Sequence, residues 1–355
     1  MAQTGSGQNR TTSSARGNAQ SKAQSNVQRK VQSRVKSRVK RKVKSKIRKS
    51  PIIIAILIIL AAVAVLLYSY GEQWFGISFF GNDKDDKKTV EKAPAPKDGE
   101  IMFHFIEVGQ GDAILITSSA GNMLIDTSEK SADDKLMAYL ESADVNSLKY
   151  LVLTHTDADH IGNATQIIEN YKVENVLLPD YVSSSDVYLE MMEAIKRTQV
   201  NLILIGTDED CEQSGYSFRL GSLVNTVISP TKQYEDANDM SIVIKSEYGD
   251  TSVMFTGDAG KKPEGDILSS WSKDTLKCDI LKAGHHGSNT STTQEFLDAV
   301  DPSIVVISCG KGNSYGHPHD EVMERLQDKG VTVYRTDMQG NIVFKTDGKT
   351  FTYVE

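Results

Sequence analysis

Beyond residue 100 the apolar residues lie in short runs separated by polar, glycine-containing stretches, which is the pattern of strands joined by turns. Runs that predict strands occupy residues 101–106, 112–117, 122–126, 150–154, 175–178, 201–205, 241–246, 252–256, 303–308, 331–334 and 341–345. Segments that predict helices lie near 133–142, 163–171, 186–198, 293–300 and 319–329. Many strands with interspersed helices indicate a layered α/β domain at residues 100–355.

A longer apolar run precedes this domain. Residues 52–68 form an uncharged stretch of seventeen residues, near the lower limit of the roughly 17 to 25 residues that span a bilayer. A buried core helix is the alternative, but most helices of water-soluble proteins keep a polar face that this run lacks. We therefore predict one transmembrane signal anchor at residues 51–70.

The distribution of charge sets the orientation of this anchor. Residues 1–50 contain fifteen Lys or Arg and no acid, so the remaining 25 basic and 47 acidic residues give the rest of the chain a net charge of −22. Cations on the amino-terminal side of the apolar run predict a cytoplasmic amino terminus and a domain outside the membrane. A cleavable secretory signal is the competing interpretation, and the long charged region and the lack of an Ala-x-Ala-like site after Leu67 disfavour it.

The basic arm at residues 1–50 divides into two parts. Residues 1–26 are rich in Ser, Gln, Gly and Ala, which predicts disorder. From Val27 to Ile47 an aliphatic residue recurs at every fourth position, which indicates a weakly amphipathic basic helix. Such a helix would lie on anionic lipid or attract nucleic acid, and a tail that only enforces topology is the alternative. Residues 71–99, with their charges and Ala93–Pro96, predict an extended extracytoplasmic linker.

Six of the seven histidines fall in three short clusters, all within the predicted domain. The clusters are His155-Thr-Asp-Ala-Asp-His160 after the apolar run at 151–153, Gly284-His-His-Gly-Ser288, and Tyr315-Gly-His-Pro-His319. Thr256-Gly-Asp258 follows the apolar run at 253–255. Two divalent ions about 3.5 to 4 Å apart require N and O ligands from several loops, usually with a bridging carboxylate. A polar surface loop would explain the first cluster alone, but the ordered set favours a metal centre.

These clusters belong to a longer ordered set of motifs. The others are Glu107-Val-Gly-Gln-Gly-Asp-Ala113 and Leu124-Ile-Asp-Thr127. Together the motifs resemble the metallo-β-lactamase superfamily, and within it the soluble hydrolase domain of ComEC-type competence proteins, over about residues 100–355. The resemblance implies an αββα sandwich, two bound divalent ions and hydrolysis of phosphodiesters or other esters in a bacterial protein.

The chain departs from the family pattern at several positions. Glu107 stands where Asp is usual, Ser128 where Gly is usual, and Asp320 where Pro often follows Gly-His-Pro-His. Many members also place a ligating histidine between the first cluster and the Gly-Asp, whereas this chain has none between His160 and His285. We therefore expect one of the two metal sites to be weaker.

The resemblance and the donor chemistry together predict a ligand set for two ions. The predicted ligands are His155 and Asp157 for one ion, Asp159 and His160 for the other, Asp258 as the bridging carboxylate, and one of His285 and His286 to complete a site. A carboxylate at Asp157, where many relatives have a second histidine, hardens the site and leaves Mn²⁺ or Fe as alternatives to Zn²⁺. The ions would convert a shared water to a hydroxide nucleophile.

Other polar residues near the clusters have predicted supporting roles. Asp126 and Asp112 would orient ligating imidazoles, with a strand-end cap as the alternative role. Ser288, His317 and His319 would bind the substrate phosphate or protonate the leaving oxygen, and a plain capping role for the loop at 315–319 is the alternative.

Taken together, the sequence favours a membrane-anchored extracytoplasmic phosphodiesterase or nuclease acting on DNA. The net charge of −22 beyond residue 50 weakens a nucleic-acid substrate, so a hydrolase of an envelope polymer, such as teichoic acid or its phosphorylcholine, is the alternative. A non-catalytic metal-binding module is a third interpretation. Nothing in the sequence favours β-lactamase activity.

Overall fold

The structure is a computed structural model that describes residues 92–354. Within these residues, eight strands form one sheet and seven form a second. The first sheet has the order β15 (Phe351–Val354), β14 (Ile342–Thr346), β1 (Ile101–Phe105), β2 (Ile114–Ser118), β3 (Gly121–Ile125), β4 (Ser147–Val152), β5 (Lys172–Pro179) and β6 (Asn201–Ile205). The second has the order β13 (Thr332–Arg335), β12 (Ile304–Ile307), β11 (Ile280–Lys282), β10 (Thr251–Phe255), β9 (Val243–Tyr248), β8 (Leu223–Ser229) and β7 (Ser217–Leu220).

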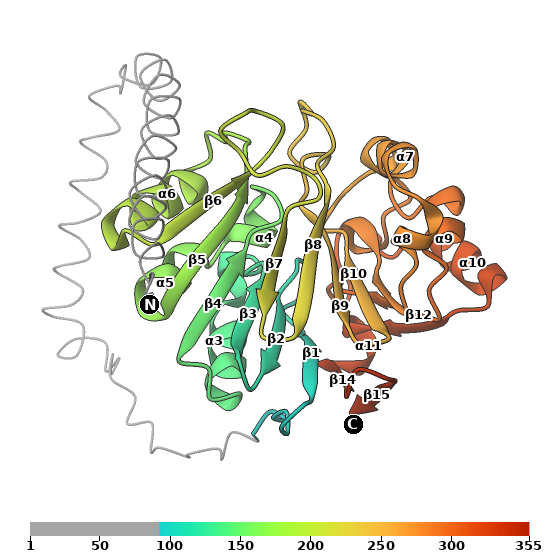
Figure 1. The fold of residues 1–355 in the computed structure, drawn as a ribbon, viewed down its shortest axis with the longest axis horizontal. Helices are drawn as coiled ribbons and strands as arrows, with labels where there is room; N and C mark the ends of the chain where they lie inside the picture. The colour runs from blue at the N-terminus through green and yellow to red at the C-terminus, as the bar shows by residue number, and fades with distance from the viewer. Residues whose placement is uncertain (1–91, 355) are drawn as a thin grey trace, which may run out of the picture. The chain divides into compact units, whose positions relative to one another are not determined.

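Helices cover the outer faces of both sheets (Figure 1). Those following strands of the first sheet are the 3₁₀ turn η1 (Lys130–Ala132), α3 (Asp133–Ser142), α4 (Ala158–Ile161), α5 (Ala164–Asn170) and α6 (Asp186–Thr198). Those of the second half are α7 (Lys261–Ser270), α8 (Lys273–Leu276), the 3₁₀ turn η2 (Gly284–Gly287), α9 (Gln294–Val300), α10 (Asp320–Lys329) and α11 (Thr336–Gln339).

Two clusters of buried apolar residues in the described part of the chain match this layering. One lies between the sheets and includes Phe103 and Phe105 of β1 and Phe255 of β10, because alternate residues of each strand point to the same face. The other lies between the second sheet and its helices and includes Phe296 of α9 and Leu326 of α10. This is the αββα sandwich that the sequence predicted.

Most of the predicted elements are present. Each of the eleven predicted runs overlaps a strand, and α3 and α6 have the predicted bounds. Four strands were missed, namely β7, β8, β11 and β15. Strands β7, β11 and β15 are only three or four residues long, and β8 has polar residues among its apolar ones. The sequence also missed α7, whose Pro263 and Gly265 are poor helix formers.

The strand directions bring the polar clusters together. Strands β3 and β4 are parallel, as are β10, β11 and β12, and the carboxyl ends of parallel strands meet at one edge of a sheet. The loops after β4, β10 and β11 carry the first histidine cluster, Asp258 and the His285–His286 pair.

Several predictions concern other parts of the chain. The basic arm at 1–50, the signal anchor at 51–70 and linker residues 71–91 lie outside the described residues. In the part of the chain that the structure describes, no helix is long and apolar enough to cross a bilayer. Cys211, Cys278 and Cys309 form no disulfide with one another.

Candidate metal centre

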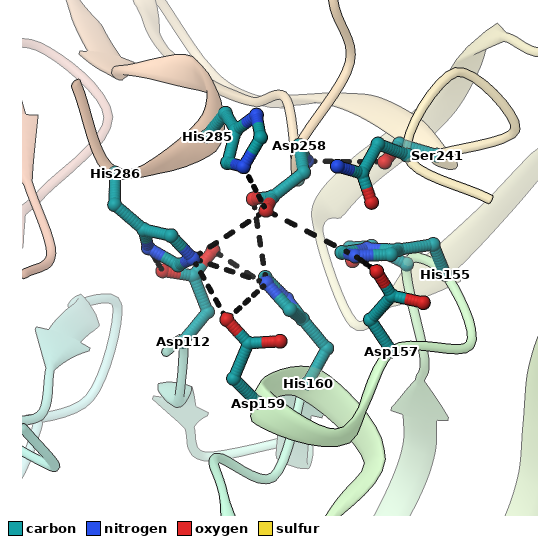
Figure 2. Close-up of polar contacts among 12 residues, drawn as sticks. Asp112, His155, Asp157, Asp159, His160, Ser241, Asp258, His285 and His286 are labelled. Atoms are coloured by element: carbon teal, nitrogen blue, oxygen red, sulfur yellow. Dashed lines mark hydrogen bonds and ion pairs between the residues drawn. The ribbon is translucent and has the colours of Figure 1, made fainter. Parts of the chain in front are cut away.

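Four buried side chains with metal-binding atoms converge where the strand ends meet (Figure 2). They are Asp112, before β2; His160, on α4; Asp258, after β10; and His286, in η2. One ligand-type atom from each lies within 4.8 Å of the others. Such a concentration of buried polar groups is costly to the fold unless the groups are paired or hold an ion.

Two imidazoles are held so that their Nε2 atoms face the centre. His160 Nδ1 lies 2.8 Å from Asp126 Oδ2, and His286 Nδ1 lies 3.0 Å from the carbonyl oxygen of Ser308. Both partners are acceptors, so each Nδ1 carries a proton and each Nε2 is the ring nitrogen that faces the centre. The two Nε2 atoms are 3.3 Å apart, which is close enough for both to be ligands of one metal ion.

Asp258 is the common neighbour of four imidazoles. Its Oδ1 lies 3.3 Å from His160 Nε2, and its Oδ2 lies 3.4 Å from His286 Nε2, 3.6 Å from His285 Nε2 and 3.9 Å from His155 Nε2. Among residues 92–354, His155 Nε2 and Asp258 Oδ1 are buried atoms without a hydrogen-bond partner. These orphaned ligand atoms fit a centre that binds divalent metal ions.

The two remaining acids of the first cluster lie beside different imidazoles (Figure 2). Asp159 Oδ2 lies 3.4 Å from His286 Nε2 and 3.9 Å from His160 Nε2. Asp157 Oδ2 lies 4.0 Å from His155 Nε2. The donors therefore fall into two groups around one carboxylate, one with His155 and Asp157 and one with Asp159, His160 and His286.

Burial and neighbouring charge act in opposite directions on these groups. Burial alone would lower the pKa of His160, but the carboxylates of Asp258 and Asp126 outweigh it and hold the pKa well above the ordinary value. The same competition raises the pKa of His286. For His155, burial prevails with help from His160 and lowers the pKa to about 3. A neutral His155 is the form that binds a metal ion.

The two adjacent histidines after β11 have distinct surroundings. His285 and His286 both adopt left-handed backbone conformations, with φ of 48° and 55°, which non-glycine residues rarely do. This turn directs both side chains toward Asp258 (Figure 2). The side chain of His286 is 1% exposed and that of His285 is 28% exposed. His285 Nδ1 lies 3.2 Å from Thr290 Oγ1.

The predicted phosphate-binding residues lie next to this turn. Ser288 Oγ is 3.0 Å from Thr290 Oγ1, and the same Thr290 hydroxyl lies within hydrogen-bond distance of His285 Nδ1, so it links the two side chains. The ring centroid of His317 is 5.6 Å from that of His285. His319 Nδ1 accepts a hydrogen bond of 2.9 Å from the amide of Asn289, and its ring centroid lies 4.9 Å from that of His317.

Comparison with known proteins bears on this centre. The family model of the metallo-β-lactamase superfamily matches residues 106–311. The chain belongs to this superfamily. ComE operon protein 3 of Bacillus subtilis is 30% identical over 275 residues, which cover 72% of this chain and 34% of that protein. Recombination protein 2 of Haemophilus influenzae is 31% identical over 242 residues, or 67% of this chain and 28% of that protein.

These matches confirm the resemblance to competence proteins, and this metallo-β-lactamase chain spans about a third of the length of those relatives. Among solved structures, the metallo-β-lactamase fold protein YhfI of Bacillus subtilis is 12% identical, with a TM-score of 0.43 over 69% of this chain and 100% of that one. The family model and these relatives make the chain a member of this superfamily related to competence proteins, with a cluster of residues that fits divalent metal ions.

The sequence missed three residues that support the centre of this superfamily member. Lys282, the last residue of β11, is fully buried, and its Nζ lies 2.5 Å from Asp112 Oδ2 and donates to the carbonyl oxygen of Gly257 at 3.2 Å. Ser241 Oγ accepts a 3.0 Å hydrogen bond from the amide of Asp258. Thr154 donates its amide and hydroxyl to Asp126, each at 2.7 Å. A lysine inside an apolar strand was the available signal for Lys282.

Proposed function

We propose that this protein is a membrane-anchored, extracytoplasmic phosphodiesterase of the nuclease type. The observation that supports it is the pair of Nε2 atoms of His160 and His286, fixed 3.3 Å apart beside the carboxylate of Asp258. A two-ion centre with a shared carboxylate suits in-line displacement at phosphorus. The competence relatives support DNA as the substrate class.

The proposed ligands follow the two groups of donors. One ion would be held by His155, Asp157 and Asp258, and the other by Asp159, His160, His286 and Asp258. We assign His286 rather than His285 as the ligand, since only His286 lies close to both Asp159 and His160 and is fully buried. Zn²⁺ and Mn²⁺ both match this mixture of imidazole and carboxylate donors.

The chain's own residues then have separate tasks. Divalent ions bound here would lower the pKa of a coordinated water and neutralise charge on the phosphoryl group. Asp126 and the Ser308 carbonyl hold the imidazoles of His160 and His286 in one tautomer. Burial and the nearby His286 lower the pKa of His317 to about 4, so this imidazole is neutral at pH 7. Together with His285 it would bind a phosphoryl oxygen.

A phosphodiester of the cell envelope is the second candidate substrate. The charge of −22 beyond residue 50 favours it, because proteins that bind nucleic acids usually carry excess Lys and Arg. The location outside the membrane rests on the basic arm at 1–50 and the apolar run at 51–70. Protease added to intact cells should therefore remove the domain while leaving residues 1–50 protected.

The activity is tested with the full-length protein and a panel of substrates. Single- and double-stranded DNA, bis-p-nitrophenyl phosphate and p-nitrophenylphosphorylcholine are each incubated with Zn²⁺ or Mn²⁺. Asp258→Asn should abolish hydrolysis without changing the circular dichroism spectrum. The same substitution at an exposed acid, Asp250→Asn, is the matched control. Metal-dependent cleavage of DNA supports the proposal, and cleavage of the choline ester alone identifies an envelope substrate. Two bound ions without turnover on any substrate would refute catalysis.

A further inference from the structure

Tyr315 stands out beside the metal centre because a large aromatic ring is exposed there. Its relative exposure is 64%, and Met338 is the other large hydrophobic residue exposed in the described part of the chain. Exposed aromatic rings have a solvation cost that binding sites commonly offset by contact with a ligand. The ring of Tyr315 stacks on His317 with centroids 5.6 Å apart and an interplanar angle of 20°.

The loop that carries Tyr315 is held rigidly by one side chain. Asn313 Oδ1 accepts from the amides of Tyr315, at 3.2 Å, and His317, at 3.0 Å. Asn313 Nδ2 donates to the carbonyl oxygens of Gly310, at 2.9 Å, and His317, at 2.6 Å. The backbone that carries the exposed ring is therefore held in one conformation, which lowers the entropy lost on binding.

The position of this ring relates it to the reaction site. Among the described residues, the ring of His317 contacts both Tyr315 and His285. Its centroid lies 5.6 Å from the centroid of each. A substrate whose phosphate lies against His285 and His317 would place its next group over Tyr315. One face of the Tyr315 ring is covered by His317, so a single flat face is free for that group.

We infer that Tyr315 stacks on a nucleobase adjacent to the scissile phosphate. The substrate is then a single-stranded nucleic acid, and this inference rests on the proposed phosphodiesterase function. A single flat face suits a planar base, whereas quaternary ammonium groups such as choline are recognised by cages of several aromatic faces. Bases in a duplex are already stacked on both sides, so an unpaired strand is the form that can reach Tyr315.

Stacking also reconciles a nucleic-acid substrate with the acidic charge of the chain beyond residue 50. Where Lys and Arg are in deficit, contacts to backbone phosphates supply little affinity. Base stacking does not depend on charge and is tolerant of sequence. Binding of a single strand should therefore weaken only slightly as salt increases.

The test compares oligonucleotides with and without bases. Full-length wild type, Tyr315→Ala, Tyr315→Phe and the control Met338→Ala are assayed for KM and kcat on a thymidine oligonucleotide and on the same oligonucleotide with abasic sites. Tyr315→Ala should raise KM for the base-bearing strand about 5- to 100-fold and leave KM for the abasic strand unchanged. Tyr315→Phe should retain the wild-type KM because the ring remains, and Met338→Ala should behave as wild type.

A binding measurement separates this inference from the proposed activity. A strand containing 2-aminopurine is titrated with each variant in EDTA, and quenching of its fluorescence should occur with wild type and Tyr315→Phe only. Quenching that depends on Tyr315 without any hydrolysis would refute the activity and support the stacking. Hydrolysis of abasic and base-bearing strands with equal KM would refute the stacking while leaving the activity intact. Competition by phosphorylcholine that Tyr315→Ala abolishes would overturn the inference in favour of a cationic group.

Discussion

The buried pair of Lys282 and Asp112 leads to a prediction about stability. Both side chains are almost completely buried, and Nζ and Oδ2 are 2.5 Å apart. Burial alone would lower the pKa of Lys282, but Asp112 and Asp258 outweigh it and raise the pKa, so the lysine is charged. Lys282→Met keeps most of the side-chain volume and removes the charge. It leaves the Asp112 carboxylate buried without its cation.

The expected loss is large because only one partner is removed. Breaking a buried ion pair in this way costs about 3 to 5 kcal/mol, which is a large part of the roughly 5 to 15 kcal/mol that stabilises a typical domain. Adding Asp112→Asn removes the uncompensated charge, so the double variant should recover most of that loss. Equilibrium urea unfolding of the full-length protein in EDTA measures both, because bound metal would otherwise add to the free energy of unfolding.

A second lysine in the same sheet provides the control. Lys245 Nζ lies 2.9 Å from Glu247, whose side chain is 47% exposed. Lys245→Met therefore removes a partly solvated pair, with an expected cost of about 1 kcal/mol. Two results would refute the reasoning. One is a free energy of unfolding for Lys282→Met within 1 kcal/mol of that of the wild type, and the other is no recovery of that free energy when Asp112→Asn is added.

Three further predictions concern the centre and its surroundings. Asp126→Ala should weaken metal binding about 10- to 100-fold, measured by calorimetry, because His160 loses its orienting acceptor; unchanged affinity would contradict this. By metal analysis, His286→Gln should lose close to one equivalent of metal, whereas His285→Gln should keep both and lower kcat; the reverse pattern would exchange their roles. Burial raises the pKa of Glu264 to about 7 from 4.5, so the folded protein binds a proton at this residue more tightly than the unfolded chain does. As pH rises from 4.5 to 7, the free energy of unfolding of the wild type should therefore fall by about 3 kcal/mol relative to that of Glu264→Gln. A constant difference in urea unfolding across that range would refute the shift.

Much of this protein follows from local sequence. Apolar runs predicted most strands, because burial on a sheet requires such residues whatever the partner strand is. The acids and histidines that follow those runs indicated a metal centre, since strand ends are rigid and imidazole and carboxylate are metal ligands. The assignment of His155 and Asp157 to one ion and of Asp159 and His160 to the other stays a prediction. In the structure His155 Nε2 lies 4.0 Å from Asp157 Oδ2, and His160 Nε2 lies 3.9 Å from Asp159 Oδ2.

Other features were decided only by tertiary structure, because they depend on pairings between distant residues. Lys282 meets Asp112 because β11 and the loop before β2 converge, and neither residue signals the other in the sequence. His286 is oriented by the Ser308 carbonyl, a backbone group that every residue carries and that no motif can mark. The sequence left His285 and His286 equivalent. The left-handed turn and the different burial of the two rings separate them, since both depend on how η2 packs against the sheet edge.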